Sequence, residues 1–202
     1  MESVLVLVRH GESEWNAKNV WTGLTDIGLT DKGRAEARLA AEKIRDIHFD
    51  RAYTSALMRA QETLSIMLGV LGLKNLPVAR DRALNERDYG VYTGKNKLEI
   101  KNELGEQRFL ALRRGWDFPV PEGESLKQVY ARVVPYFEQI ILPQLTQGQH
   151  VLIVAHGNSL RALMKKLDDI SDESIAQVEL ATGAPVVYHT DGEGRVLSRD
   201  VR

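Results

Sequence analysis

Short apolar runs alternate with longer amphipathic stretches along the chain. The runs lie at residues 4–8, 49–55, 76–80 and 150–155, and the stretches lie at residues 29–46, 56–72, 125–145 and 158–167. An uninterrupted run such as VLVLV (4–8) is typical of a strand covered on both faces, whereas apolar residues spaced three and four apart indicate helices. The alternation predicts a three-layer α/β/α fold with a mostly parallel central sheet.

Two of the predicted helices carry recognisable caps. Thr30 is the expected N-cap of the first helix, and Ser125 is the expected N-cap of the long third helix. The predicted inward-facing residues are Ala35, Leu39, Ala40 and Ile44 in the first helix, and Leu126, Val129, Val133, Phe137, Ile140 and Ile141 in the third. Pro135 is expected to bend the third helix.

Two further regions have a different character. Residues 82–116 are dense in charge and weak in periodicity, which predicts loops and short helices. Residues 185–199 predict two strands joined by the turn DGEG (191–194).

Length, charge and cysteine content narrow the class of protein. The chain has 202 residues, a length that predicts a single catalytic domain over residues 1–202. It has no cysteine, which excludes disulfides and a thiol nucleophile, and its net charge of −1 argues against a nucleic-acid partner. We find no signal-peptide pattern and no long apolar run, so we expect a cytoplasmic protein without a membrane partner.

Two of the predicted strands end on a histidine followed by glycine. VLVLVRHGES (4–13) and VLIVAHGNSL (151–160) place His10 and His156 at equivalent ends of two core strands. One such histidine is usually an ordinary hydrogen-bonded residue. Because ligands bind beyond the carboxyl ends of strands in these sheets, the pair predicts one shared site.

The surrounding residues favour phosphoryl transfer. A metal site would need a third ligand such as Glu12 or Glu86, and neighbouring arginines repel a cation. The patterns G-x-S-x-G, G-x-G-x-x-G and the P-loop are absent. A neutral imidazole is a good nucleophile toward phosphorus, and a transferring phosphoryl group requires clustered cations, which Arg9 and Arg59 could supply. We therefore predict a metal-free phosphohistidine mechanism.

Several motifs resemble those of a known superfamily. LVRHGESEWN (7–16), TSALMRAQET (54–63) and AHGNS (155–159) are similar to the histidine phosphatase superfamily. Four further motifs are similar to its cofactor-dependent phosphoglycerate mutases, the family primed by 2,3-bisphosphoglycerate. They are WTGLTDIGLTDKG (21–33), LNERDYGVYTGKNK (84–97), RRGWD (113–117) and HGNSLRALMKKLD (156–168).

The resemblance implies a role for each matching residue. His10 would carry the phosphoryl group, and Glu86 would exchange a proton with the substrate hydroxyl. The phosphoryl oxygens would be bound by Arg9, Arg59, His156, Asn16 and the amide of Gly157. The rest of the substrate would be held by Ser13, Thr22, Gly23, Tyr89, Lys97, Arg113, Arg114 and Asn158.

The resemblance also implies a reaction and its molecules. Small-molecule substrates, 3-phosphoglycerate and 2-phosphoglycerate, would be interconverted in glycolysis and gluconeogenesis, with 2,3-bisphosphoglycerate as primer and no metal. It is compatible with a homodimer.

Two other functions remain open at the level of sequence. A phosphatase would let water attack phosphorylated His10, and a non-catalytic protein would only bind phosphorylated metabolites. Residues 116–125 form a shorter segment than in familiar bacterial mutases, and PEGES (121–125) is similar to the phosphatase branch. Lys97 and the pair Arg113–Arg114 favour a mutase over a general phosphatase, unless the two arginines are simply a solvated helix end.

Overall fold

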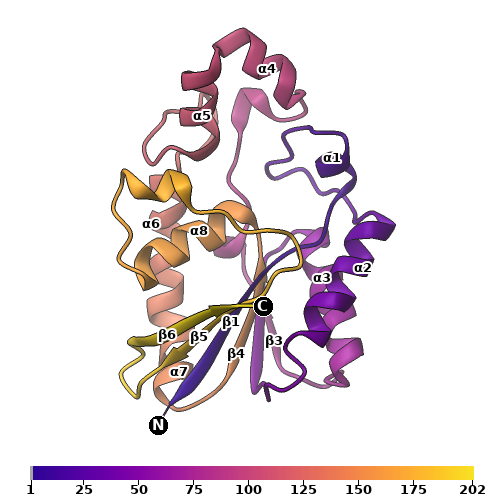
Figure 1. The fold of residues 1–202 in the computed structure, drawn as a ribbon, viewed down its shortest axis with the longest axis vertical. Helices are drawn as coiled ribbons and strands as arrows, with labels where there is room; N and C mark the ends of the chain where they lie inside the picture. Colours follow the sequence, from indigo (N-terminus) through magenta and orange to yellow (C-terminus); the bar gives the residue numbers. More distant parts are fainter. Residues whose placement is uncertain (1) are drawn as a thin grey trace.

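Six strands form one sheet in the computed structural model, which describes residues 2–202 (Figure 1). The strands are β1 (Ser3–Arg9), β2 (Arg51–Thr54), β3 (Val78–Arg80), β4 (Val151–Ala155), β5 (Val186–Thr190) and β6 (Val196–Val201). Their order across the sheet is β3-β2-β4-β1-β5-β6. β3, β2, β4 and β1 run parallel to one another, and β5 is antiparallel to both β1 and β6. The predicted mostly parallel sheet is confirmed.

Helices connect the strands and cover both faces. They are α1 (Glu14–Ala17), α2 (Asp31–Glu42), α3 (Met58–Leu71), α4 (Lys97–Leu104), α5 (Glu106–Arg114), α6 (Leu126–Tyr136), α7 (Leu142–Thr146) and α8 (Gly157–Leu167). Shorter helical turns lie at Arg82–Leu84, Gly90–Tyr92 and Ser174–Gln177, and a π-helical turn lies at Phe137–Ile141.

The alternation of side chains along β1 explains the three layers. Leu5 and Leu7 pack with α6, α7 and α8 on one face, and Val6 and Val8 pack with α2 and α3 on the other. Figure 1 shows the two helical layers on opposite sides of the sheet, with α4 and α5 beyond the carboxyl ends of β1 and β4. The three-layer α/β/α prediction is therefore confirmed.

The buried face of α2 differs from the prediction. Thr30 caps the helix as expected, since its Oγ1 accepts a hydrogen bond from the Gly33 amide at 3.0 Å. Leu39 is 62% exposed and Ala35 is exposed as well, so their predicted burial was wrong. The helix instead turns Gly33 inward, because a Cβ there would lie 2.1 Å from the carbonyl oxygen of Glu12. This close backbone contact fixes the rotation of the helix and buries its alanines.

The third predicted helix is interrupted. Ser125 caps α6 as predicted, in a capping box with Gln128. Pro135 lies inside α6, two residues before the π-helical turn. A π turn holds more residues than an α turn, which shifts the inward face toward Ile141 and leaves Ile140 45% exposed. The predicted burial of Ile140 was therefore wrong, while the other five inward positions are buried.

Candidate active site

The two histidines lie side by side at the ends of adjacent strands. β1 and β4 pair in parallel with Arg9 opposite Ala155, and the His10 amide donates to the Ala155 carbonyl at 3.0 Å. The centroids of the His10 and His156 rings are 4.9 Å apart. The predicted meeting of the two His-Gly strand ends is confirmed.

The surroundings of His10 prepare it to act as a nucleophile. Its Nδ1 lies 2.7 Å from the carbonyl oxygen of Gly11, and since a carbonyl only accepts, Nδ1 carries the proton. The ring is 2% exposed, and burial followed by the charges of Arg59 and Arg9 lowers the pKa of His10 well below its usual value. The imidazole is therefore neutral at pH 7, with its lone pair on Nε2.

His156 is held by a residue that sequence reasoning missed. Its Nε2 lies 2.7 Å from the hydroxyl oxygen of Ser55, which already accepts a hydrogen bond from the amide of Leu57. The Ser55 hydroxyl proton has no other acceptor in residues 2–202, so we assign it to Nε2. Burial and the charge of Arg59 lower the pKa of His156 well below its usual value. The neutral ring then carries its own proton on Nδ1, which has no partner among the described residues.

Two buried arginines provide cations beside His10. Arg59 is 1% exposed and donates through Nη1 to the Thr25 carbonyl at 3.0 Å and through Nη2 to the Gly23 carbonyl at 2.9 Å. Arg9 donates through Nη1 to the Leu180 carbonyl at 2.9 Å. The Nε–H groups of both arginines are buried without a partner in the described part of the chain. Such donors fit the oxygens of a phosphoryl group.

Glu86 presents one bound and one free oxygen. Its Oε1 accepts from the Arg87 amide at 2.8 Å and from the amide and the side-chain Nδ2 of Asn158, both at 3.1 Å. Its Oε2 accepts no hydrogen bond from residues 2–202. A Cβ on Gly157 would lie 3.8 Å from this Oε2 and 3.6 Å from Cζ of Arg9, so the glycine keeps the space between them open. Oε2 is therefore the oxygen that can exchange a proton.

One cavity of about 770 Å³ connects these groups. All predicted site residues except Ser13 and His156 line it: Arg9, His10, Asn16, Thr22, Gly23, Arg59, Glu86, Tyr89, Lys97, Arg113, Arg114, Gly157 and Asn158. His156 is fully buried against the His10 ring. Ser13 caps α1 by accepting from the Asn16 amide at 3.3 Å, and it lies outside the lining.

Sequence reasoning missed about half of the lining. The additional residues are Trp21, Arg161, Met164, Gln177, Val178, Glu179, Leu180, Ala181, Ala184, Val186, Arg199 and Val201. Arg161 follows Gly157 by one helical turn, and this spacing could have identified it. Its Nη1 donates to Oδ1 of Asn158 at 3.1 Å, and burial lowers its pKa to about 10. The segment from Gln177 to Ala184 carries no motif.

A second group of cations lies at the α4–α5 end of the cavity. Lys97 begins α4, and Arg113 and Arg114 end α5. Burial, then the charges of Arg113 and Arg9, lower the pKa of Lys97 to about 8. Arg114 forms an ion pair with Glu179, and Arg113 lines the cavity although it is exposed. The two arginines thus belong to the cavity wall and not to a helix end that faces only solvent.

Residues 2–202 contain no group of three or more histidine, cysteine, aspartate or glutamate side chains that could hold a metal ion. In the same range, every helix is too short or too polar to cross a membrane.

The comparison with family models matches residues 5–200 to the histidine phosphatase superfamily, branch 1. The chain belongs to this superfamily. More specifically, it belongs with the 2,3-bisphosphoglycerate-dependent phosphoglycerate mutases: the enzyme of that name from Parvibaculum lavamentivorans is 50% identical, covering 100% of this chain and 97% of the relative. The motif-based resemblance is confirmed at both levels.

Solved structures support the same fold. A mycobacterial glucosyl-3-phosphoglycerate phosphatase is 25% identical, with a TM-score of 0.82 over 100% of this chain and 98% of its own. A phosphoglycerate mutase from Bacillus anthracis is 21% identical, with a TM-score of 0.80 over 100% and 92%. The fold is therefore shared by mutases and phosphatases.

Proposed function

We propose that this protein interconverts 3-phosphoglycerate and 2-phosphoglycerate in glycolysis and gluconeogenesis. One observation carries the proposal: a single cavity contains the neutral His10, the free Oε2 of Glu86, and cations at two separate places. A substrate with a phosphate and a carboxylate requires both groups of cations. The 50% identity to a named mutase supports the same assignment.

The first half-reaction transfers the phosphoryl group from His10 to the substrate. The free hydroxyl of 3-phosphoglycerate attacks phosphorus while the bond from Nε2 of His10 to phosphorus breaks. Oε2 of Glu86 accepts the hydroxyl proton, and the substrate becomes 2,3-bisphosphoglycerate. The Nε–H groups of Arg9 and Arg59 and Nδ1–H of His156 stabilise the charge on the phosphoryl oxygens.

The second half-reaction runs these events backward at the other phosphate, after the bisphosphorylated intermediate has reoriented. Nε2 of His10 attacks that phosphorus and the bond from phosphorus to the substrate oxygen breaks. Glu86 returns its proton to the leaving oxygen, so 2-phosphoglycerate is released and His10 is loaded again. Arg113 and Arg114 suit the substrate carboxylate because a guanidinium binds two oxygens at once, whereas Lys97 acts as a point charge. In this proposal, 2,3-bisphosphoglycerate supplies the phosphoryl group that first loads His10.

Hydrolysis of small phosphate monoesters is the second candidate. It is supported by the similarity to the mycobacterial phosphatase and by the short segment 116–125. In a phosphatase, the phosphate monoester itself loads His10 and releases its alcohol, and water then attacks phosphorus in place of a substrate hydroxyl, so that inorganic phosphate leaves.

Product analysis distinguishes these functions. The protein is incubated with 3-phosphoglycerate, with and without 2,3-bisphosphoglycerate, and the products are followed by phosphorus NMR. We expect 2-phosphoglycerate at a rate that rises strongly with the primer. Release of inorganic phosphate without 2-phosphoglycerate would establish the phosphatase, and binding without turnover would establish a metabolite-binding protein.

The proposal extends to the context of the reaction. We place it in the cytoplasm, where glycolytic intermediates are made and used. We assign it to residues 1–202 as one domain, because β1 and β6, from opposite ends of the chain, lie in the same sheet. A homodimer stays a prediction that sedimentation can test.

A further inference from the structure

Glu86 lies on an irregular segment between two short helical turns, Arg82–Leu84 and Gly90–Tyr92. A group that transfers a proton has to be held within about 0.5 Å of its working position. A regular helix or strand would provide this through its own hydrogen bonds. The segment around Glu86 has no such ladder, so other parts of the chain must fix it.

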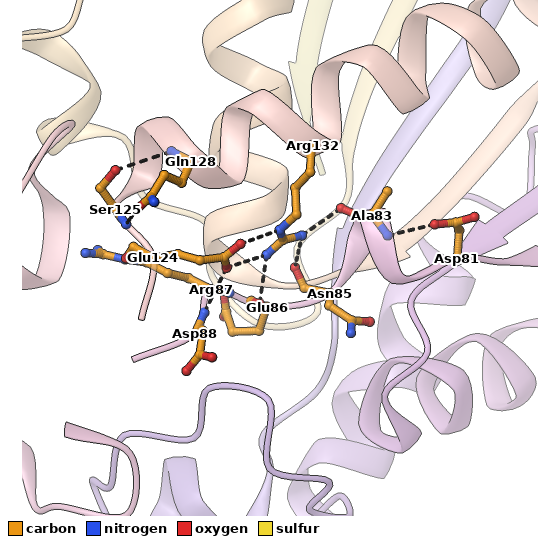
Figure 2. A network of polar contacts seen from close by, with 10 residues as sticks. All are labelled: Asp81, Ala83, Asn85, Glu86, Arg87, Asp88, Glu124, Ser125, Gln128 and Arg132. Carbon is orange, nitrogen blue, oxygen red and sulfur yellow. Dashed lines mark hydrogen bonds and ion pairs between the residues drawn. The ribbon is translucent and has the colours of Figure 1, made fainter. Parts of the chain in front are cut away.

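Arg132, on α6, binds this segment through its backbone (Figure 2). Its Nη1 donates to the carbonyl oxygens of Ala83 at 2.7 Å and Asn85 at 3.0 Å, and its Nη2 donates to the carbonyl oxygen of Glu86 at 3.0 Å. One guanidinium therefore holds three carbonyls within four consecutive residues. The third of these belongs to Glu86 itself.

Glu124 fixes the orientation of that guanidinium. Its Oε1 accepts from Nε of Arg132 and its Oε2 accepts from Nη2, both at 2.8 Å, which is the two-bond geometry of a strong arginine–carboxylate pair. The same Oε2 accepts from the Asp88 amide at 3.0 Å, so Glu124 also holds the chain beyond Glu86. Glu124 lies in the short segment 116–125.

A second arginine, Arg87, is the residue that follows Glu86 and is held in place by its own contacts. Arg87 is fully buried and donates through Nη1 to the Leu112 carbonyl at 2.9 Å and through Nε to the Glu124 carbonyl at 2.5 Å. Its backbone amide binds Oε1 of Glu86 at 2.8 Å. Figure 2 shows Arg87, Glu124 and Arg132 gathered around the backbone of Glu86.

We propose that Arg132 is a positioning residue for Glu86, whose backbone it fixes so that the free Oε2 stays in the cavity. The inference rests on the proposed function for the role of Glu86 in proton transfer. Arg132 is absent from the cavity lining, so it acts through Glu86 and not on the substrate. A lysine has the same charge but cannot bind three carbonyls and a carboxylate at once.

The test uses the leaving group of the substrate. An alkyl phosphate such as 2,3-bisphosphoglycerate needs a proton on its leaving oxygen, whereas 4-nitrophenyl phosphate releases a stable phenolate that does not. We measure the burst of His10 phosphorylation, which reports the transfer onto His10 alone. In Arg132→Lys we expect the burst rate with 2,3-bisphosphoglycerate to fall by about 10²-fold and the burst with 4-nitrophenyl phosphate to change little.

Arg202→Lys is the matched control. Arg202 also binds a backbone carbonyl, that of Lys43 at 3.1 Å, and pairs with Asp46 at 2.5 Å, but it lies outside the cavity. Both burst rates should be unchanged in this control. Glu124→Gln provides a second variant should Arg132→Lys fail to fold, and we expect the same selective loss.

A double-mutant cycle tests whether Arg132 acts through Glu86. Glu86→Gln alone should show the selective loss, and adding Arg132→Lys should reduce the rate no further. Equal loss with both substrates, or additive losses in the double variant, would overturn the proposal. If 2,3-bisphosphoglycerate does not phosphorylate the wild-type protein, the proposed function fails, and the same comparison with another alkyl phosphate still decides the role of Arg132.

Discussion

Individual side chains in the cavity owe their protonation states to burial among cations. The pKa of His10 is lowered because the neutral ring is favoured away from water and beside Arg59 and Arg9. The same physics acts on Lys97, whose pKa falls to about 8. Burial thus creates a nucleophile at one place and a titratable anion-binding group at another.

Substrate binding should become weaker at alkaline pH as Lys97 loses its charge. Below pH 8 the free protein holds Lys97 charged, and as the pH rises through the lowered pKa the charge is lost. An anionic substrate binds the charged form, so KM for 3-phosphoglycerate should rise above pH 8, by at most about tenfold per pH unit. In Lys97→Arg the charge persists, and steady-state kinetics should show a flat KM. A rise that survives in this variant would assign the titration to another group.

His10 should carry the phosphoryl group as a covalent adduct. Its Nδ1 proton is committed to the Gly11 carbonyl, which leaves Nε2 as the attacking atom. Brief incubation with 2,3-bisphosphoglycerate should give an acid-labile, base-stable adduct that peptide mapping places on His10. His10→Ala should abolish labelling and turnover. A phosphate mapped to His156 or to a serine would refute the assignment.

At the scale of helices and strands, sequence patterns gave the elements but not every buried face. Both strand ends bearing histidine were predictable, because an apolar run followed by His-Gly indicates the carboxyl end of a buried strand. The rotation of α2 was not, since it depends on backbone contact between Gly33 and residues 11 and 12, far apart in sequence. Likewise, the exposure of Ile140 follows from a π turn that apolar spacing does not reveal.

The corrected face of α2 can be tested by stability. Leu39 is exposed, so Leu39→Ala should change the free energy of unfolding by less than about 0.5 kcal/mol. Leu64 on α3 is 2% exposed and packs against the sheet, so Leu64→Ala should cost about 2–5 kcal/mol. Urea denaturation measures both. Similar losses in the two variants would mean that α2 buries the other face.

The arginines at the carboxyl end of α5 should be needed by a mutase but not by a phosphatase. A mutase has to retain a bisphosphorylated intermediate while it reorients, which requires the cations far from His10. Replacing both Arg113 and Arg114 by alanine should lower mutase activity at least about 10²-fold, since each charge-assisted bond contributes about 1.5–3 kcal/mol. Hydrolysis of a small aryl phosphate should be much less affected.

Arg108→Ala is the control for this double variant, because Arg108 lies on the same helix but is exposed and outside the cavity lining. Both activities should be normal in it. If the double variant loses both activities together, Arg113 and Arg114 act on the reacting phosphate or on folding. If it loses neither, the mutase assignment loses its main support over the phosphatase.

For the whole molecule, the order of the strands explains which cavity residues could be predicted from the sequence and which could not. A parallel sheet predicts a site at the carboxyl ends of its strands, and that site contains almost every predicted residue. The segment from Gln177 to Ala184 was missed because only the tertiary path brings it to the cavity. There the Leu180 carbonyl accepts from Arg9, 171 residues earlier in the chain.

The two arginines beside His10 should also make the reaction independent of metal. Arg9 and Arg59 neutralise the transferring group, and no metal-ligand cluster exists in residues 2–202. Turnover of 3-phosphoglycerate should survive exhaustive chelation, and vanadate, which mimics pentacoordinate phosphorus, should inhibit it. Activity that disappears with chelator and returns with manganese would show a different mechanism.

The position of β1 has a consequence for synthesis on the ribosome. This strand is made first, yet its two neighbours are β4 and β5, which begin at Val151 and Val186. At about 5–20 residues per second, its apolar side chains wait on the order of ten seconds for a partner strand. A nascent chain halted before Val151 therefore exposes an unpaired apolar strand that is prone to aggregation, and it has no phosphate pocket. Translational pauses in the middle of the message should leave chains that depend on chaperones and have no activity.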